Sequence, residues 1–199
     1  MNEMDKKICG VILAGGASRR MGKLKPLLKL EGKNFTHILK KKIKQSGVGD
    51  VYLVLGSRAE YIKKNLNTDG LNIIINNSWP EGQLSSLKTA LKKIKDKYRA
   101  LVMFLIDHPQ VKQTTVKALI KAFKKKSDRD IYIPSYKRRS GHPVIFNRTV
   151  FKALLNAPLD EGARAVTKNP DFKKEWVNVN DPYIRQDIDT PEDYDNIDE

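Results

Sequence analysis

Two nearly continuous apolar runs, Ile8–Ala14 and Ala100–Ile106, restrict the fold of this sequence more than any other feature. Runs of strand length without polar alternation are typical of parallel strands that are covered on both faces. Two further runs of strand length, Val51–Leu55 and Leu71–Ile75, lie between them. The sequence therefore predicts a parallel sheet in which the first and last of these runs are inner strands.

Segments with helical periodicity alternate with these strands. Apolar residues recur every three or four positions in three stretches, as on the buried face of an amphipathic helix, and lysines occupy many of the other positions. The three stripes are Phe35, Ile38, Leu39 and Ile43; Leu84, Leu87, Leu91, Ile94 and Tyr98; and Val116, Leu119, Ile120 and Phe123. Strands that alternate with helices indicate a doubly wound α/β sheet.

The second half of the chain has a more mixed pattern. Shorter strands are expected at Asp130–Ser135, His142–Phe146, Trp176–Val179 and Arg185–Ile188, and helices at Arg148–Asn156 and Glu161–Lys168. No repeat, linker or low-complexity stretch separates the two halves. We therefore expect residues 1–199 to form a single domain of the Rossmann-like, three-layer α/β/α class with a mostly parallel sheet.

The charge and cysteine content limit the classes of protein. A formal net charge of +15 favours an anionic partner, either nucleic acid, an anionic membrane or a phosphorylated small molecule. The single cysteine, Cys9, lies in an apolar run and is expected to be a buried thiol. No run approaches the roughly 20 apolar residues of a membrane helix, and Met1–Lys7 lacks the pattern of a signal peptide. These features predict a cytoplasmic protein.

A glycine-rich, basic loop at Leu13–Lys25 directly follows the first buried strand. In an open α/β sheet this position is the carboxyl edge, where ligands bind. Gly15 and Gly16 allow backbone N–H groups to approach an anion closely. The spacing matches neither G-x-G-x-x-G nor a Walker A loop. The loop is a candidate triphosphate site, with a solvated basic loop as the alternative, and its cations are Arg19, Arg20, Lys23 and Lys25.

Acidic residues at two places suggest a metal site. Asp107 ends the strongest apolar run and emerges where the glycine-rich loop also emerges. Mg²⁺ in such sites is held by one or two carboxylates together with substrate phosphates. Strand alternation would put Asp187 and Asp189 on one face, and Pro191 marks the start of a helix after them. The sequence thus offers Asp107 and one or both of the later carboxylates as ligands.

The loop at residues 77–87 joins a strand to an amphipathic helix. Ser85 or Ser86 could cap that helix while presenting a hydroxyl to a ligand. Together with Gln83 and backbone groups, such a loop can contact the edge of a base.

The stretch 140–146 follows three consecutive basic residues. A basic turn that enters a strand suits a substrate with a phosphate and a flat heterocycle. His142 either contacts this substrate or only begins the strand.

Taken together, these motifs resemble the MobA-like nucleotidyltransferases of molybdenum cofactor. The glycine-rich loop matches L-A-G-G-x-S-x-R-M-G-x-x-K over thirteen positions in register, and Asp187–Asp193 matches a D-I-D-T-P-E-D element. Gly141–Val144 and Asp160–Arg164 match parts of two elements found in the cytidylyltransferase branch. The resemblance implies a nucleotide-diphospho-sugar transferase-like fold and transfer of CMP from CTP to molybdenum-molybdopterin, with release of pyrophosphate.

The resemblance also implies roles for individual residues. Arg20, Lys25 and Asp107 would be catalytic, and Asp107 with Asp189 would hold Mg²⁺. The acceptor would be bound by Arg139, Gly141 and His142. The nucleotide-binding residues would be Leu13, Ala14, Gly15, Gly16, Ser18, Arg20, Lys25, Gly82, Ser85, Ser86 and Asp107.

Other functions stay open on the sequence. Within the same class, the enzyme would use GTP, or a sugar or alcohol phosphate as acceptor. From another class, the charge of +15 suggests a nucleic-acid-binding protein, although basic motifs interleaved with aromatic residues are absent. A molybdenum hydroxylase apoenzyme is a compatible protein partner, and no membrane partner is expected.

Overall fold

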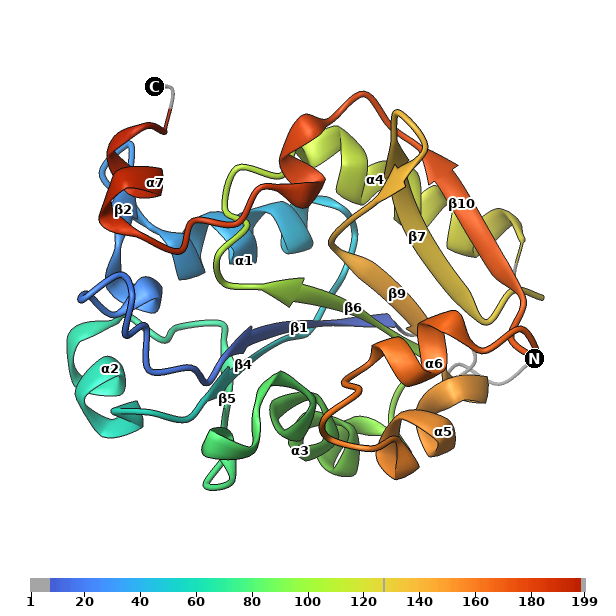
Figure 1. Cartoon of the computed structure of the whole chain (residues 1–199), viewed down its shortest axis with the longest axis horizontal. Coiled ribbons are helices and arrows are strands. Elements are labelled where there is room, and N and C mark those ends of the chain that lie inside the picture. Colours follow the sequence, from blue (N-terminus) through green and yellow to red (C-terminus); the bar gives the residue numbers. More distant parts are fainter. Residues whose placement is uncertain (1–7, 127, 198–199) are drawn as a thin grey trace.

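The structure, a computed structural model, describes residues 8–126 and 128–197, and in it helices cover both faces of a central sheet (Figure 1). Within these residues, eight strands form the sheet in the order β10-β7-β9-β6-β1-β4-β5, with β8 paired to β7. The strands are β1 (Ile8–Ala14), β4 (Val51–Leu55), β5 (Asn72–Ile75), β6 (Ala100–Leu105), β7 (Ile131–Tyr136), β8 (Arg139–Ser140), β9 (Val144–Asn147) and β10 (Lys174–Asn178). The expectation for Met1–Lys7 falls outside the described residues.

The α-helices are α1 (Phe35–Gln45), α2 (Ala59–Asn65), α3 (Gln83–Ile94), α4 (Gln113–Lys125), α5 (Phe151–Asn156), α6 (Arg164–Lys168) and α7 (Pro191–Asp195). Short 3₁₀ helices lie at Lys25–Leu27, Trp79–Glu81, Arg148–Val150 and Pro182–Arg185. A small hairpin, β2 (Lys29–Leu30) and β3 (Lys33–Asn34), stands apart from the main sheet. In the part of the chain that is described, no helix has the length and apolar character needed to span a bilayer.

The two faces of β1 belong to separate hydrophobic cores, because successive side chains of a strand point in opposite directions. Ile12 packs into one core with Phe35 of α1. Cys9 packs into the other core with Leu87 of α3. All seven residues of β1 are buried. This arrangement confirms the three-layer α/β/α class, and it confirms that Cys9 is a buried thiol, whose pKa burial raises.

The strands expected in the first half are present almost residue for residue. β1 and β4 have the predicted ends, and β1 and β6 lie next to each other near the centre of the sheet. β1 pairs in parallel with both β4 and β6. In the second half, β9 runs antiparallel to β6 and β7. The sheet is therefore mostly, but not wholly, parallel.

One local expectation was wrong, and one helix was missed. Arg185–Ile188 is not a strand, because Pro182–Arg185 forms a 3₁₀ helix and the Ile188 N–H donates to the carbonyl of Asp107 (2.9 Å). Helix α2 was not expected, since its seven residues bury only Ala59 and Ile62. A segment of that length is too short for helical periodicity to stand out.

The order of the strands places a binding edge beside β1. The chain runs outward from β1 to β4 and β5, and then returns to the other side of β1 as β6. Ligands in open α/β sheets bind at such a reversal, outside the carboxyl ends of the strands. Leu13 of β1 is paired with Leu105 of β6, so the loops that follow the two strands start side by side. Those loops begin with Gly15 and contain Asp107.

The C-terminal segment is folded back along this same edge. The His142 N–H donates to the carbonyl of Ile184 (2.7 Å), and the Ile188 N–H donates to the carbonyl of Asp107 (2.9 Å). These two contacts anchor residues 184–188 over the sheet. They bring the acidic segment, nearly 80 residues later in the sequence, beside Asp107.

A substitution at Gly141 tests this anchoring. A Cβ atom there would lie 2.0 Å from the carbonyl oxygen of Ile184, whereas a Cβ at Gly49 would meet nothing within 4 Å. We expect Gly141→Ala to lower the free energy of unfolding by about 2 kcal/mol, as overpacking does, and Gly49→Ala to leave it nearly unchanged. Urea unfolding monitored by circular dichroism measures both. Equal stability of the two variants would contradict the tight approach of the C-terminal segment.

Candidate functional site

A cavity of about 290 Å³ opens at the carboxyl ends of β1 and β6. It receives side chains or backbone from the glycine-rich loop, the loop before α3, the end of β6 and the C-terminal segment. We call it the first cavity, and its lining is Leu13, Ala14, Gly15, Gly16, Ser18, Arg19, Arg20, Lys25, Pro26, Trp79, Gly82, Gln83, Ser86, Leu105, Ile106, Asp107 and Asp189. Of the predicted nucleotide-binding and metal-binding residues, Ser85 is the one that this lining leaves out.

The glycine-rich loop is shaped by its own short contacts. Ser18 adopts a left-handed backbone conformation (φ 52°), and its carbonyl accepts a hydrogen bond from the Gly22 N–H (3.0 Å). The hydroxyl of Ser18 accepts a hydrogen bond from the Lys25 N–H (3.3 Å). Lys25 then begins the 3₁₀ helix 25–27. These hydrogen bonds within the loop hold the backbone of Lys25, and with it the start of its side chain, in place.

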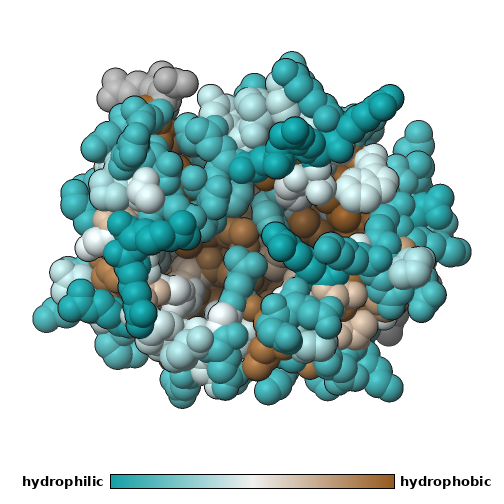
Figure 2. Space-filling view, in the orientation of Figure 1, coloured by the Kyte–Doolittle hydropathy of each residue, from teal (hydrophilic) through white to brown (hydrophobic). Residues whose placement is uncertain are grey.

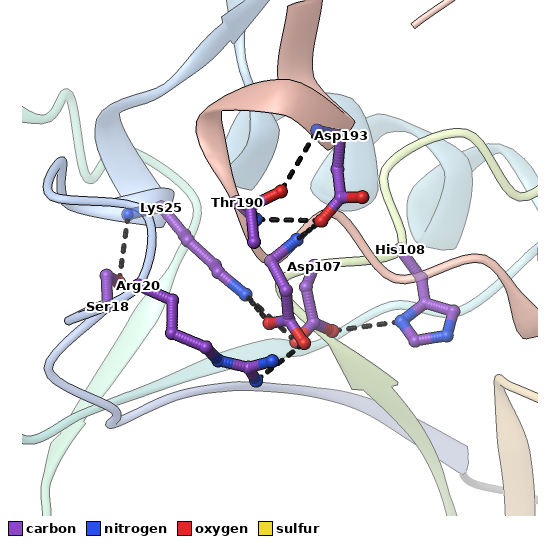
Figure 3. Close-up of polar contacts among 8 residues, drawn as sticks. Ser18, Arg20, Lys25, Asp107, His108, Thr190 and Asp193 are labelled. Carbon is purple, nitrogen blue, oxygen red and sulfur yellow. Dashed lines mark hydrogen bonds and ion pairs between the residues drawn. The ribbon is translucent and has the colours of Figure 1, made fainter. Parts of the chain in front are cut away.

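Lys25 lies at the centre of the site, between two carboxylates (Figure 3). Its Nζ is 2.5 Å from Oδ1 of Asp189 and 3.3 Å from Oδ2 of Asp107. The whole residue is only 7% exposed. Arg20 adds a second cation at the mouth, where its Nη2 donates to Oδ2 of Asp189 (2.7 Å) while the side chain stays 72% exposed. Residues far apart in the sequence therefore form one ion cluster, Arg20–Asp189–Lys25–Asp107.

The two carboxylates of the cluster are held in the ionised form. Burial by itself would raise the pKa of Asp107, but the hydrogen bond and charge of His108, followed by those of Lys25, lower the pKa to about 2. For Asp189, the effect of burial is likewise outweighed by Lys25, which lowers the pKa below its ordinary value. Both aspartates are therefore acceptors and potential cation ligands at neutral pH.

Asp189 is held in position by the start of α7. Thr190 is the N-cap of this helix, and its hydroxyl accepts a hydrogen bond from the Asp193 N–H (3.1 Å). The Asp193 carboxylate in return accepts from the N–H groups of Asp189 (2.9 Å) and Thr190 (2.8 Å). These backbone donors lower the pKa of Asp193. The expected helix start at Thr190-Pro191 is confirmed, and it forms a complete capping box that fixes the backbone of Asp189.

The loop before α3 is organised by a residue that the sequence analysis did not single out. Asn76 is 1% exposed, and its Nδ2 donates to the hydroxyls of Ser85 (2.8 Å) and Ser86 (3.0 Å). The Ser85 hydroxyl lies within hydrogen-bond distance of the carbonyls of Ser78 (2.9 Å) and Gly82 (2.7 Å), which share its single proton, so it is used within the loop. Gly82, not a serine, is the N-cap of α3. Asn76 directly follows β5, and Asp107 follows β6 by two residues. A polar residue at the carboxyl end of an apolar strand was therefore the signal that could have pointed to Asn76.

The donor set fits a small divalent cation. Asp107 and Asp189 both direct a carboxylate oxygen at the Nζ of Lys25. Mg²⁺ in nucleotide sites takes one or two carboxylates together with phosphate oxygens. Among the described residues, no three His, Cys, Asp or Glu side chains form a cluster that could hold a metal without such help. Asp187 lines a different cavity from Asp189. The predicted strand does not form there, but Asp187 still lies close enough to Asp189 for its side chain to help lower the pKa of Asp189.

A larger, second cavity of about 810 Å³ adjoins the first, and both are lined by Gln83 and Leu105. Of the three residues predicted to bind the acceptor, Gly141 and His142 line the second cavity, whereas Arg139 lies on β8 outside this lining. Figure 2 shows hydrophobic side chains in the floor of a hollow on this face, with hydrophilic side chains around it. Trp176, which is 53% exposed, is part of the cavity wall.

Two imidazoles meet in the wall of the second cavity. The rings of His108 and His142 pack edge to face, with centroids 5.4 Å apart. Nδ1 of His108 is 2.9 Å from Oδ1 of Asp107. Nδ1 of His142 is buried and has no hydrogen-bond partner among the described residues. An orphaned polar atom at a cavity wall is the kind of group that a ligand satisfies.

Comparison with known proteins finds relatives that are similar to this chain over nearly its whole length. A family model described as the MobA-like NTP transferase domain matches residues 10–175. Nicotine blue oxidoreductase of Paenarthrobacter nicotinovorans is 27% identical over 192 residues, which cover 93% of each chain. A probable molybdenum cofactor guanylyltransferase of Natranaerobius thermophilus is 28% identical over 203 residues, covering 96% of this chain and 94% of the relative.

Solved structures are similar over the same length. Rv0371c from Mycobacterium tuberculosis H37Rv matches with a TM-score of 0.80 at 25% identity, covering 96% of this chain and 97% of that chain. A complex of Rv0371C with manganese matches with a TM-score of 0.74 at 25% identity, covering 95% and 96%.

The buried imidazole of His142 makes stability depend on pH. Burial, with His108 as a second cause, lowers the pKa of His142 from 6.5 to about 4. Between these values the unfolded chain binds a proton that the folded chain does not, so stability is present above pH 6.5 and is lost as the pH falls toward 4. From pH 7 to pH 4.5 we expect His142 to account for a loss of about 2 kcal/mol.

His142→Phe, which cannot take up a proton, should lack this part of the decline. Urea unfolding of both proteins at pH 7 and pH 4.5 measures the difference, and each protein serves as its own reference at pH 7. The same decline in both proteins would show that His142 is not held neutral.

Proposed function

The chain belongs to the MobA-like NTP transferase family and is a nucleotidyltransferase, and we propose that it transfers CMP from CTP to molybdenum-molybdopterin. Its fold is the Rossmann-like fold of the nucleotide-diphospho-sugar transferases, as the sequence suggested. The ion cluster Arg20–Asp189–Lys25–Asp107 at the mouth of the first cavity carries this proposal, because it combines cations for a triphosphate with carboxylates for its divalent cation.

The nucleotide would occupy the first cavity. Its phosphates would lie against Gly15 and Gly16, whose backbone can approach an anion closely, and against Arg20 and Lys25. In the structure both cations are bound to carboxylates. Phosphate oxygens must therefore replace Asp107 and Asp189 as partners of Lys25. That exchange leaves the carboxylates available to the cation that accompanies the triphosphate.

The proposed reaction is an in-line displacement at the α-phosphorus. A phosphate oxygen of the acceptor forms a bond to the α-phosphorus, the bond from that phosphorus to the bridging oxygen of the β-phosphate breaks, and pyrophosphate leaves. An ionised phosphate needs no general base, so no proton has to be removed. Lys25 and Arg20 stabilise the charge that develops on the α-phosphate and the leaving group, and the shape of the site holds the reactants in line.

Asp107 and Asp189 would hold a divalent cation, which we propose to be Mg²⁺. When bound, it supplies Lewis-acid polarisation of the phosphate oxygens and neutralises charge on pyrophosphate. The similar protein Rv0371C has been solved in complex with manganese, which supports the proposal that this chain also binds a divalent cation. The role of the two aspartates in this chain is to stay ionised and to keep their oxygens directed at one point.

The acceptor would bind in the second cavity, beside the first. Gly141 and His142 line it, and the orphaned Nδ1 of His142 offers a polar contact. The exposed indole of Trp176 in the same wall suits a flat ring. Arg139 does not line the second cavity, so it would act on the acceptor only through the positive charge of its side chain.

The choice of CTP and molybdopterin rests on motifs. Gly141–Val144 and Asp160–Arg164 match elements of the cytidylyltransferase branch, whereas one relative is named a guanylyltransferase and another an oxidoreductase. GTP, or a sugar or alcohol phosphate as acceptor, is the alternative within the class. A molybdenum hydroxylase apoenzyme would receive the product, and the reaction would take place in the cytoplasm.

One experiment decides between these substrates. The protein is incubated with MgCl₂, each of the four nucleoside triphosphates in turn and molybdopterin cofactor, and pyrophosphate and dinucleotide products are measured. We expect both products with CTP. If both products formed with GTP and with no other nucleotide, the choice of CTP would be overturned. If pyrophosphate formed with none of the four nucleotides, the choice of molybdopterin as acceptor would be overturned. Binding of duplex DNA or RNA with a steep salt dependence, and no transfer, would favour the nucleic-acid alternative.

Asp107→Ala should lower kcat by about 100-fold or more, because a group that stabilises charge at the reacting phosphates is lost. Asp96→Ala is the matched control, since the Asp96 side chain is 85% exposed and precedes β6, at the end of that strand opposite to Asp107. A pyrophosphate-release assay measures both variants. A wild-type rate for Asp107→Ala would show that Asp107 has no role in the reaction.

Lys25→Met should change the binding of cation and nucleotide in opposite directions. Without the ammonium group, Asp107 and Asp189 lose their internal counter-ion, so Mn²⁺ alone should bind more tightly than to wild type. CTP should bind about tenfold more weakly, because one charge-assisted contact to its phosphates is gone. Mn²⁺ electron paramagnetic resonance and CTP calorimetry measure the two affinities.

Lys117→Met, on the exposed surface of α4, is the matched control. It should change neither affinity. If Lys25→Met weakened Mn²⁺ and CTP alike, the exchange of partners at Lys25 would be refuted.

A further inference from the structure

His108 lies directly beside the reacting centre, although no role follows for it from the motifs. It is 6% exposed, and its Nδ1 is 2.9 Å from Oδ1 of Asp107. Because the carboxylate is ionised, it can only accept, so Nδ1 of His108 is the donor in this hydrogen bond. Figure 3 shows the two side chains meeting on the side of Asp107 that faces away from Arg20.

The two oxygens of Asp107 have different partners. Oδ1 is bound by His108, and Oδ2 is bound by Lys25 at 3.3 Å. In the proposed function the nucleotide draws Lys25 onto its phosphates. His108 is then the protein side chain that still holds the Asp107 carboxylate in its rotamer.

We propose that His108 is the positioning residue of the site: its Nδ1–H holds Oδ1 of Asp107, so that Oδ2 stays directed at the divalent cation of the bound nucleotide. This inference rests on the proposed function. It concerns Asp107 as a cation ligand and does not depend on which acceptor or which base the enzyme uses.

The surroundings of His108 suit a rigid support. Its backbone N–H donates to the carbonyl of Leu105 (3.2 Å), which forms a turn at the end of β6. Its ring packs edge to face on His142, and it lines the second cavity while Asp107 lines the first. The imidazole is thus held from both sides, between the nucleotide and the proposed acceptor site.

Groups that hydrogen-bond to a metal-binding carboxylate or imidazole change metal affinity by about 10-fold to 100-fold when they are removed. We therefore expect the loss of the His108 donor to weaken Mn²⁺ binding to the protein–CTP complex by about tenfold. The affinity for CTP without a divalent cation should change little, because His108 does not line the first cavity.

A matched pair of variants isolates the hydrogen bond. Asn and Leu branch at the same carbon and have similar shapes, but only Asn places an N–H group where Nδ1 of His108 stands. We expect His108→Asn to keep the Mn²⁺ affinity of the CTP complex within about threefold, and His108→Leu to lower it about tenfold. Mn²⁺ electron paramagnetic resonance, with and without CTP, measures this, and thermal unfolding checks that both variants are folded.

The outcomes separate this inference from the proposed function. Equal affinities in the wild type and both variants, or equal losses in both variants, would overturn the role of His108 while the proposed function stands. The role of His108 would also be overturned if the folded fraction of His108→Leu bound Mn²⁺ with wild-type affinity, so that the apparent loss came only from unfolded protein. If wild type bound no Mn²⁺ with any nucleoside triphosphate, the proposed function would fail, and this inference with it.

Discussion

The ammonium group of Lys25, bound between Asp107 and Asp189, is the interaction on which the site depends. It joins three separate segments: the loop after β1, the end of β6 and the C-terminal segment before α7. A cation that is 7% exposed has little water around it, so its two carboxylates supply the solvation that it has lost. Removing Lys25 or one of the two carboxylates would leave a buried charge without its counter-ion, which is unfavourable. The three segments therefore hold one another in place.

The same interaction explains how the site could be ready for a charged ligand without collapsing on itself. In the proposed function, the cations and carboxylates of the cluster would neutralise one another until phosphates and a divalent cation arrive together and replace each half of the pair. Chemistry of this kind needs positioned charges, and it needs no proton transfer by the protein. The second cavity meets the first at Gln83 and Leu105, so an acceptor there would lie beside the reacting phosphates.

The excess of positive charge has two different explanations. Arg20 and Lys25 belong to the ion cluster, but the many lysines of α1, α3 and α4 lie largely on outer helix faces, as the exposed Lys117, Lys121 and Lys124 do. The acidic C-terminal segment proved more informative than the net charge of +15, because it supplies Asp189. A net charge describes long-range attraction, whereas the site is formed by a few groups at contact distance.

The sequence by itself determined the layers of this protein and the edge of the sheet where ligands bind. Continuous apolar runs and amphipathic helices leave few other ways to bury their side chains, and a loop after an inner strand must emerge at the carboxyl edge. Tertiary structure decided which polar groups meet there. Ser85 turns into the loop, Asn76 organises that loop, Asp187 and Asp189 line different cavities, and His108 holds Asp107. Most of these contacts join residues within ten positions of one another. The direction in which a loop side chain turns depends on the groups packed around it, and it leaves no periodic pattern from which it could be predicted.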